Sequence, residues 1–579
     1  MLFREFAEYL ERLEKISSRL EIAEVLAELI EKMGLGETAM GVYLTQGLLG
    51  PVYDNREFSM AGKMVVRAIA MASGESVEVV EKKYKELGDL GALVVSYRES
   101  GTGKNLSLGD VFVALKEVAY FEGTGSQDLK VNKLSELIST TSSLEGKFIV
   151  RMVMGKLRLG FSEKTIFDAL SKIGNGDKSL RKELDRVYQL YPDSGEIVKV
   201  FKSEGVSGLR RITVKVGVPI VSALCQRLNT YEEIVKNMSE VAIEPKYDGT
   251  RVQIHFRRIS DIRSQSSDSW TVKSFTRNLE ESSAMFPELK KMGEFVKSGE
   301  IILDCEAVGY DVKTGRILSF QETITRKRKH GVEEAAASVP LRFFCFDVLF
   351  CNGENLLSRP YFERRKILGE QVLENKVLVV DESIKTTEPV ELEEIHTRFL
   401  EDGYEGAVMK KWDGEYLPGR QGWNWVKIKE AEGTSGKLAD TFDLAVLGYY
   451  FGKGKRSGFG IGAFLVGTKK GESWVSLAKI GTGLTDEEFV ELKKKLDKFK
   501  LTSKSNKVVV EDILKPDVWT EPNVVVEIAA DEITKSPSHS GGVALRFPRL
   551  VKFRDDKGVN GITTWEEVLE IGKLSGNVF

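Results

Sequence analysis

The segment Glu244-Pro-Lys-Tyr-Asp-Gly-Thr-Arg251 contains the residues best suited to covalent chemistry. Lys246 stands at the end of an expected strand, the Asp-Gly pair predicts a turn, and Arg251 begins the next strand. A lysine is protonated near neutral pH, so a nucleophilic lysine needs its pKa lowered by burial or by a nearby positive charge, including that of a metal ion. Arg251 supplies one such charge. The segment therefore predicts a nucleophilic lysine.

The pattern Lys-x-Asp-Gly is weak on its own, because it occurs a second time at Lys411-Trp-Asp-Gly414. The second copy is followed by Pro418, which cannot donate to a strand ladder, whereas the first is followed by an unbroken strand. For an isolated lysine in such a turn, the ordinary role is that of a surface residue. We predict that Lys246 is the nucleophile and that Lys411 is not.

The elements that must position Lys246 are predicted by the residues around it. After residue 241, short β-rich runs at residues 251–256, 301–303 and 341–346 alternate with helical stretches such as 362–374. Period-two runs that alternate with helical segments are typical of a mixed α/β domain. We expect Lys246 to lie at the edge of a sheet in that domain.

The two ends of the chain have a different character. Up to about residue 215, apolar residues recur at spacings of three and four, as in residues 3–33 and 129–138, which predicts a helical domain. After about residue 430, strands separated by Gly-rich turns dominate, which predicts a small closed barrel. With 579 residues the chain exceeds one hydrophobic core, so about three or four domains are expected.

Composition and charge exclude several classes of protein. At 42% hydrophobic and 30% charged residues, the chain is typical of globular proteins rather than disordered or fibrous ones. The 84 basic and 87 acidic residues nearly cancel, so any nucleic-acid surface must be local. The four cysteines form no Cys-x-x-Cys pair, which argues against a zinc ribbon. No stretch has the roughly 20 apolar residues that span a bilayer, and the first residues do not form a signal peptide, so we expect an intracellular (cytoplasmic) protein with no membrane contact.

An ordered set of further motifs accompanies Lys246. They are Ser274-Phe-Thr-Arg-Asn-Leu-Glu280, Leu303-Asp-Cys-Glu-Ala-Val308, Phe346-Asp-Val-Leu-Phe350, Glu405-Gly-Ala-Val-Met-Lys410, Trp425-Val-Lys-Ile-Lys429, Arg546-Phe-Pro-Arg549 and Arg554-Asp-Asp-Lys557. With this set, the sequence resembles the covalent nucleotidyltransferase superfamily of ATP-dependent ligases and mRNA capping enzymes. Two runs, Ser319-Phe-Gln-Glu-Thr-Ile-Thr-Arg-Lys-Arg-Lys329 and residues 145–160, are similar to replicative ATP-dependent DNA ligases of the archaeal and eukaryotic type. The resemblance covers essentially the whole chain.

The resemblance implies a multidomain fold and a ligase activity. The fold would comprise an all-α DNA-binding domain at residues 1–215, an α/β (α+β) nucleotidyltransferase, or adenylation, domain at 216–431 and a C-terminal β-barrel OB-fold domain at 432–579. The implied enzyme seals nicks between a 5′-phosphate and a 3′-hydroxyl in duplex DNA during replication, repair and recombination. AMP would pass from ATP to Lys246 and then to the 5′-phosphate, and it would leave when the 3′-hydroxyl attacks.

The resemblance also assigns roles in the middle domain. Lys246 would carry AMP, while Glu306 and Glu405 would hold a metal ion, with Mg²⁺ expected and Mn²⁺ as the alternative. Phe346 would stack on adenine, although an aromatic residue in an apolar run is also typical of a core. The remaining contacts to the base, ribose and phosphates of ATP would come from Glu244, Arg251, Arg277, Glu306, Arg420, Gln421, Lys427 and Lys429.

Basic residues at both ends of the chain would bind phosphates. In the helical domain the predicted DNA contacts are Arg151, Lys156 and Arg158. A rotation about a hinge near residues 430–433 would bring the C-terminal motif to the ATP phosphates and later remove it. The residues of that motif are Arg546, Arg549, Arg554 and Lys557.

Two positions depart from the family pattern. Relatives usually have an arginine where this chain has Gln421, and here the arginine is the preceding residue, Arg420. Either that contact is lost or Arg420 makes it. Lys552 also stands where relatives usually have arginine, a change that keeps the charge but loses bidentate geometry.

The expected partner is nicked duplex DNA, bound by a monomer through the backbone, with little sequence preference and a steep salt dependence. A sliding clamp is a further candidate partner, although the sequence contains no clear clamp-binding peptide. Two alternatives remain: an RNA-directed nucleotidyltransferase that uses the same lysine, and a non-enzymatic DNA-binding scaffold. The helical N-terminal region argues against the first, and the full set of nucleotide motifs argues against the second. The lack of a cysteine-rich zinc module argues against a NAD-dependent ligase, while ADP or NAD as a secondary donor stays open.

Overall fold

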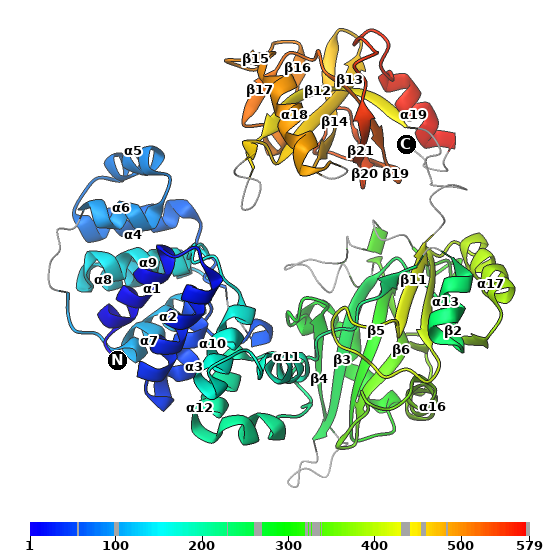
Figure 1. Ribbon diagram of the computed structural model, residues 1–579, viewed down its shortest axis with the longest axis horizontal. Helices are drawn as coiled ribbons and strands as arrows, with labels where there is room; N and C mark the ends of the chain where they lie inside the picture. Colours follow the sequence, from blue (N-terminus) through cyan, green and yellow to red (C-terminus); the bar gives the residue numbers. More distant parts are fainter. Residues whose placement is uncertain are drawn as a thin grey trace. The chain divides into compact units, whose positions relative to one another are not determined.

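The computed structural model describes residues 1–54, 57–97, 103–228, 230–259, 269–318, 322–323, 326, 336, 338–429, 441–452, 459–481 and 484–574. They form two compact units, Met1–Ile428 and Lys429–Phe579 (Figure 1). The side chain of Lys429, the hinge at residues 430–433 and most of the basic run at 319–329 lie outside the described residues. The predicted boundaries at residues 215 and 431 stay a prediction.

Helices build the first part of the first unit, as the spacing of apolar residues predicts (Figure 1, blue to cyan). They are α1 (Phe3–Glu14), α2 (Arg19–Lys32), α3 (Leu35–Thr45), α4 (Gly62–Ser73), α5 (Val77–Leu87), α6 (Leu90–Tyr97), α7 (Leu108–Tyr120), α8 (Ser126–Thr140), α9 (Ser143–Val153), α10 (Glu163–Asn175), α11 (Arg181–Leu190) and α12 (Ser194–Arg211).

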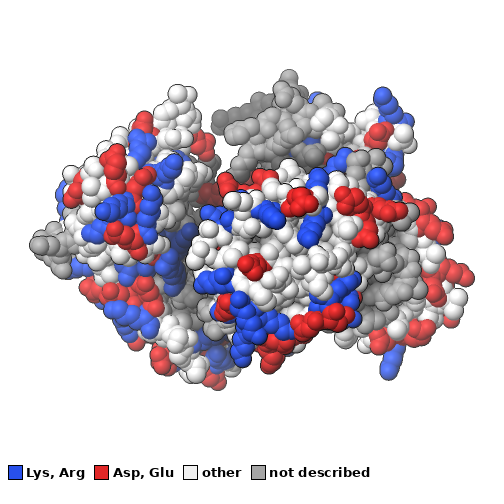
Figure 2. Space-filling model, turned by 90° about the horizontal axis from the view of Figure 1, so that it is seen from above, with Lys and Arg blue, Asp and Glu red and all other residues white. Residues whose placement is uncertain are grey.

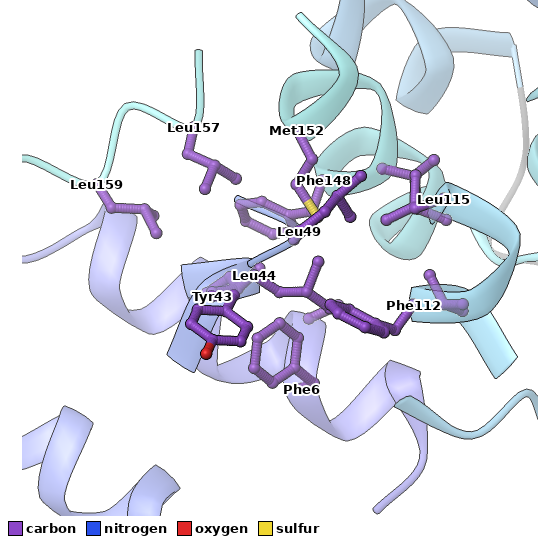
Figure 3. Close-up of a cluster of buried hydrophobic side chains, with 14 of the residues drawn as sticks. Phe6, Tyr43, Leu44, Leu49, Phe112, Leu115, Phe148, Met152, Leu157 and Leu159 are labelled. Carbon is purple, nitrogen blue, oxygen red and sulfur yellow. The ribbon is translucent and has the colours of Figure 1, made fainter. Parts of the chain in front are cut away.

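The core of this helical region joins helices that are distant in sequence. Figure 3 shows Phe6 of α1, Tyr43 of α3, Phe112 of α7 and Phe148 of α9 pointing into one cluster, and all four side chains are buried. Burial of a large apolar side chain stabilises the fold by about 1.5–3 kcal/mol. The helices therefore owe their stability mainly to this shared face.

Two sheets follow in the same unit (Figure 1, green to yellow). The five-stranded sheet has the order β1-β11-β10-β2-β9, and the six-stranded sheet has the order β4-β3-β5-β6-β7 with β8 paired to β6. The strands are β1 (Gln226–Arg227), β2 (Val241–Pro245), β3 (Thr250–Ile259), β4 (Ser269–Thr276), β5 (Glu300–Gly309), β6 (Leu341–Cys351), β7 (Glu354–Asn355), β8 (Leu378–Val380), β9 (Ile384–Thr386), β10 (Gly406–Lys411) and β11 (Trp425–Lys429).

The strand pattern of the sequence explains these sheets. In β3, Val252, Ile254 and Phe256 point to one side and pack in one apolar cluster with Leu303 of the neighbouring β5. On the other sheet, residues of β2 and β10 pack against two helices. The helices of this mixed region are α13 (Tyr231–Met238), α16 (Tyr361–Gln371) and α17 (Pro389–Glu401). The prediction of a mixed α/β region is confirmed.

The second unit is rich in strands. Its main sheet has the order β15-β17-β12-β13-β14-β16, and β18 pairs with both β12 and β21. Among the described residues no strand pairing joins the two ends of this sheet, so the sheet is an open half-barrel, and the closed barrel expected from the sequence is not confirmed. The elements are β12 (Phe442–Tyr450), β13 (Ala463–Lys470), β14 (Ser473–Ile480), α18 (Asp486–Asp497), β15 (Lys500–Leu501), β16 (Val508–Val509), β17 (Val518–Thr520), β18 (Val525–Ala529), β19 (Glu532–Lys535), β20 (Val543–Arg546), β21 (Arg549–Phe553) and α19 (Trp565–Leu574).

The surface agrees with the near balance of charges. On the face seen in Figure 2, basic and acidic side chains are interspersed. Within the part of the chain that the structure describes, no helix is both long and apolar enough to cross a membrane.

Candidate active site

A cavity of about 640 Å³ opens where the two sheets of the first unit meet, and Lys246 lies in its wall. One part of the wall is apolar and the other is charged. The apolar part includes Leu224, Phe346, Val408 and Trp425, and the charged part includes Glu244, Lys246, Arg251, Arg277, Glu306, Asp381, Glu405, Lys410, Arg420 and Lys427. Most of the residues predicted for the middle domain are therefore brought together.

Strand pairing places Lys246 against Glu405. Strand β2 ends one residue before Lys246, and β10 begins one residue after Glu405, and these two strands are antiparallel neighbours. The backbone N–H of Lys246 donates to the carbonyl of Gly406 at 3.0 Å, and the N–H of Glu405 donates to the carbonyl of Lys246 at 2.9 Å. With the backbones fixed in this way, the Lys246 ammonium donates to the Glu405 carboxylate.

The Asp-Gly turn after Lys246 has a steric reason. A Cβ on Gly249 would lie 2.5 Å from the carbonyl oxygen of Ala307 in β5, so only glycine permits this close approach of the loop to the strand. The second Lys-x-Asp-Gly copy has a different setting. Lys411 does not line the cavity, and its ammonium lies 3.5 Å from the exposed carboxylate of Asp413. The geometry thus favours Lys246 over Lys411 as the nucleophile.

Glu306 lies on β5 and lines the same cavity as Lys246 and Glu405. Burial raises the pKa of Glu306 to about 8, and the negative charges of Asp304 and Glu405 add to that rise, although Arg251 and Lys246 lower it. Glu306 and Glu405 line the same cavity, and carboxylate oxygens are suitable ligands for a hard divalent cation. Among the described residues, no group of three or more His, Cys, Asp or Glu side chains forms a metal site by itself.

Arg251 is held in the cavity wall by a network of its own. Its Nε and Nη2 atoms donate to the two carboxylate oxygens of Asp304 at 3.0 and 2.6 Å, and Nη2 also donates to the hydroxyl of Tyr416 at 3.2 Å. Its Nη1 atom donates to the carbonyl of Ala223 at 2.6 Å. Burial lowers the pKa of Arg251, but the ion pair with Asp304 outweighs burial and raises it overall. A guanidinium has five N–H groups, so these four bonds leave one for a ligand.

Arg420 and Gln421, the two candidates for the contact that an arginine usually makes in relatives, lie in different places. Arg420 lines the cavity, whereas Gln421 does not. The Gln421 side-chain amide instead donates to the carbonyl of Pro418 at 2.6 Å. Gln421 uses one amide N–H within its own turn and does not line the cavity, so the geometry favours Arg420 for this contact, and a contact from Gln421 stays a prediction.

The position of Phe346 is compatible with both roles that the sequence left open, and stacking on adenine stays a prediction. Its side chain is 8% exposed and belongs to an apolar cluster with Tyr416 and Trp425, yet it also lines the cavity. Lys427 lines the cavity from β11, while its neighbours Val426 and Ile428 are buried, as alternation along a strand predicts.

Sequence reasoning missed three charged residues of this site. Asp304 fixes Arg251, Lys410 binds Glu244 at 2.6 Å, and Asp381 accepts a hydrogen bond from the Tyr247 hydroxyl at 2.8 Å. Burial, followed by the nearby charge of Glu244, raises the pKa of Asp381 well above its ordinary value. Asp304 and Lys410 lie within two of the motifs named above, but nothing in the sequence assigned them a role, and Asp381 follows an apolar strand.

The predicted DNA contacts of the helical region fall into two groups. Lys156 and Arg158 are exposed, and Arg158 is 54% exposed although it pairs with Asp89 at 3.0 Å. Arg151 is only 7% exposed, and its guanidinium pairs with Glu14 at 2.7 Å and Asp89 at 3.1 Å. The expectation that Arg151 contacts DNA directly is corrected: its donors are used inside the protein, where it supports the loop that carries the other two residues.

The predicted cations of the second unit are paired with carboxylates of the same unit. Arg554 and Lys557 both bind Asp443, at 2.9 and 2.6 Å. Further pairs join Arg546 to Glu532 at 3.3 Å, Arg549 to Asp531 at 2.8 Å and Lys552 to Glu527 at 3.3 Å.

Comparisons with known proteins find similarity to DNA ligases along the chain. Family models described as "DNA ligase N terminus", "ATP dependent DNA ligase domain" and "ATP dependent DNA ligase C terminal region" match residues 2–171, 222–429 and 457–557. A "Probable DNA ligase" of Dictyoglomus turgidum is 42% identical over 99% of this chain and 97% of that protein. "DNA ligase 2" of Korarchaeum cryptofilum is 36% identical over 99% of this chain and 97% of its own length. A solved structure titled "Pmar-Lig_PreS3" covers 95% of this chain and 99% of its own, with a TM-score of 0.53 and 18% identity, and so shares the fold.

Proposed function

The chain belongs to the family of ATP-dependent DNA ligases, and from this premise we propose that it seals nicks in duplex DNA through AMP carried on Lys246. The observation that carries this assignment is the position of Lys246: it lies in the wall of a cavity large enough for a nucleotide, against Glu405, while the other Lys-x-Asp-Gly lysine lies outside. Ligand cavities of about 300–1,000 Å³ are typical of small-molecule sites.

In the first transfer, the Lys246 amine would attack the α-phosphorus of ATP, a P–N bond would form, and pyrophosphate would leave. The attacking nitrogen must be a neutral amine, so Lys246 would have to leave its ion pair with Glu405 and give up a proton to solvent before the P–N bond forms. Arg420 and Lys427 line the same cavity and would stabilise the negative charge of the phosphates. AMP would then pass to the 5′-phosphate of the nick, and attack by the 3′-hydroxyl would release it.

A divalent cation fits this donor set. Glu306 and Glu405 would hold Mg²⁺, which usually takes one or two carboxylates together with water and substrate phosphate oxygens. When bound, the ion would offset negative charge around the α-phosphate.

The other regions would bind the remaining parts of the substrates. Lys156 and Arg158 would contact DNA phosphates, and we propose that the strand-rich second unit is a domain of the OB-fold type. Its cations Arg546, Arg549, Arg554 and Lys557 would assist adenylylation.

The test is transfer of label from ATP labelled at the α-phosphorus, with Mg²⁺ present. We expect label on the denatured wild-type chain, none on Lys246→Ala, and unchanged label on the matched control Lys411→Ala. Sealing of a nicked duplex with a labelled 5′-phosphate should follow the same pattern. Label that persists on Lys246→Ala, or a wild type that takes no label from ATP, would contradict the assignment.

A further inference from the structure

Lys410 is an ammonium buried in the wall of the nucleotide cavity. It is 1% exposed, and its Nζ lies 2.6 Å from a carboxylate oxygen of Glu244. It also donates to the backbone carbonyl of Phe346 at 3.0 Å. The aromatic rings of Phe346, Trp425 and Tyr361 surround it, with centroids 4.6, 4.5 and 5.1 Å from Nζ.

This arrangement is not needed for stability alone. Desolvation of two charges opposes the attraction between them, and an apolar pair of similar volume often stabilises a core equally well or better. Lys410 and Glu244 are respectively 1% and 2% exposed, yet both line the cavity. A buried ion pair at the wall of a ligand cavity therefore points to recognition.

Lys410 helps to determine whether Glu244 can accept or donate a hydrogen bond toward a ligand. One carboxylate oxygen of Glu244 accepts from Lys410, and the other accepts from the hydroxyl of Tyr361. An ammonium has no lone pair, so it can only donate to its partner. With donors on both oxygens, the carboxylate stays an acceptor, and its remaining lone pairs can accept only from a ligand that donates.

The position of Glu244 relative to Lys246 indicates which part of a nucleotide it meets. The two residues are separated by one residue at the end of β2, so their side chains leave the same side of the strand. Phe346, Val408 and Trp425 form the apolar wall near Glu244, and such a wall suits a purine base. Glu244 would then face the edge of the base while Lys246 faces the α-phosphate.

We propose that Lys410 is a positioning residue for base selection: by keeping Glu244 an acceptor, it admits a purine with an amine at this edge and rejects one with a carbonyl oxygen there. This inference rests on the proposed function. Lys410 itself need not touch the base, and it acts through Glu244 and with Tyr361. The ligand class is a 6-aminopurine triphosphate, as opposed to a 6-oxopurine triphosphate.

The experiment compares label transfer to the full chain from α-labelled ATP and from α-labelled inosine triphosphate, whose base has a carbonyl oxygen in place of the amine. The quantity measured is the ratio of the two kcat/KM values. In Lys410→Met, one oxygen of Glu244 would lose the ammonium that holds it, so the carboxylate could turn away from the base edge and would discriminate less between an amine and a carbonyl. We expect the ATP preference to fall by about 10- to 100-fold, the worth of a hydrogen bond to a charged group.

Two variants separate this effect from general damage. Lys410→Arg keeps a cation and should retain most of the preference, whereas Lys411→Met, on the same strand but outside the cavity, should leave it unchanged. If Lys410→Met does not fold, Tyr361→Phe decides, because it removes the second donor and keeps the ring. Its ATP preference should fall by a smaller factor, about fivefold, because Lys410 still holds the other oxygen of Glu244.

The outcomes distinguish this inference from the function on which it rests. A wild type that takes label from neither nucleotide contradicts the proposed function. A wild type that prefers ATP, together with an unchanged preference in Lys410→Met or Tyr361→Phe, overturns the role of Lys410 and leaves the ligase assignment intact.

Discussion

Replacement of His255 by asparagine should remove part of the acid sensitivity of the first unit. His255 lies in β3 and is 1% exposed. The backbone N–H of Gly217 donates to its Nδ1 atom at 2.9 Å, and its other ring nitrogen lies 3.0 Å from Oε1 of Gln253. The ring is therefore neutral, with Nδ1 as acceptor, and protonation of Nδ1 would break the bond from Gly217.

The size of the effect depends on the pKa of His255. Burial, followed by the charges of Lys273 and Arg257, lowers it from 6.5 to about 3. Between these two values the unfolded chain binds a proton that the folded chain does not, so the free energy of unfolding falls as pH falls through that window. At pH 5 the loss due to this residue is about 2 kcal/mol, whereas at pH 7 it is about 0.2 kcal/mol.

The assay is unfolding in urea at pH 7 and pH 5, with pulse proteolysis and detection of peptides from β3, for wild type and His255→Asn. The asparagine side chain does not titrate, and its oxygen can accept from Gly217. Its smaller volume lowers stability at both pH values, so the comparison uses the change with pH. The wild type should lose about 2 kcal/mol more than the variant. Equal losses in the two proteins would refute the argument.

Three further predictions concern packing and charge. Asp347→Asn should lower the free energy of unfolding of the first unit by about 3–5 kcal/mol in the same assay, because Asp347 and Arg364 form an ion pair in which both side chains are 0% exposed. A loss below about 1 kcal/mol would show that solvent reaches the pair. Arg158→Ala should reduce the slope of log affinity for duplex DNA against log salt by about one. Arg151→Met should leave that slope unchanged and lower the melting temperature. A slope that changes in Arg151→Met and not in Arg158→Ala would indicate that Arg151 contacts DNA directly. Gly467→Ala should destabilise the second unit by about 1–3 kcal/mol in thermal unfolding, since the added Cβ would lie 2.2 Å from the carbonyl oxygen of Val475; a neutral result would mean that the sheet adjusts freely there.

The strands and the nucleophile were predictable because each has a local signal. Short β-rich runs of residues predicted β3, β5 and β6, and the three- and four-residue spacing of apolar residues predicted the helical first part. The preference for Lys246 over Lys411 came from the residues on the C-terminal side of each lysine, and the cavity lies on the side of Lys246. These signals lie within about ten residues of the feature that they predict.

The remaining features depend on contacts between distant segments. Arg151 resembles a DNA contact in sequence, but Glu14 of α1 and Asp89 of the connection between α5 and α6 pair with it. Lys410 and Lys411 are adjacent and identical, and only the pairing of β10 with β2 decides that Lys410 meets Glu244. Closure of a barrel depends in the same way on which strand edges meet, and strand propensity does not determine that.

The pairing of charges in the cavity bears on how a polyanion can enter it. Lys246, Arg251 and Lys410 each bind a carboxylate, namely Glu405, Asp304 and Glu244. These three pairs are electrically neutral, so their cations attract a triphosphate only weakly until a carboxylate is itself neutralised. Glu405 is the partner best placed to change, because Glu306 lines the same cavity, and burial, together with the negative charges of Asp304 and Glu405, disfavours the charged form of Glu306 and raises its pKa to about 8. A positive charge that binds beside these two groups would favour the charged form of Glu306 and compete with Lys246 for Glu405, which would release Lys246 from its ion pair, so entry of the triphosphate and activation of the nucleophile would depend on the same pair of residues.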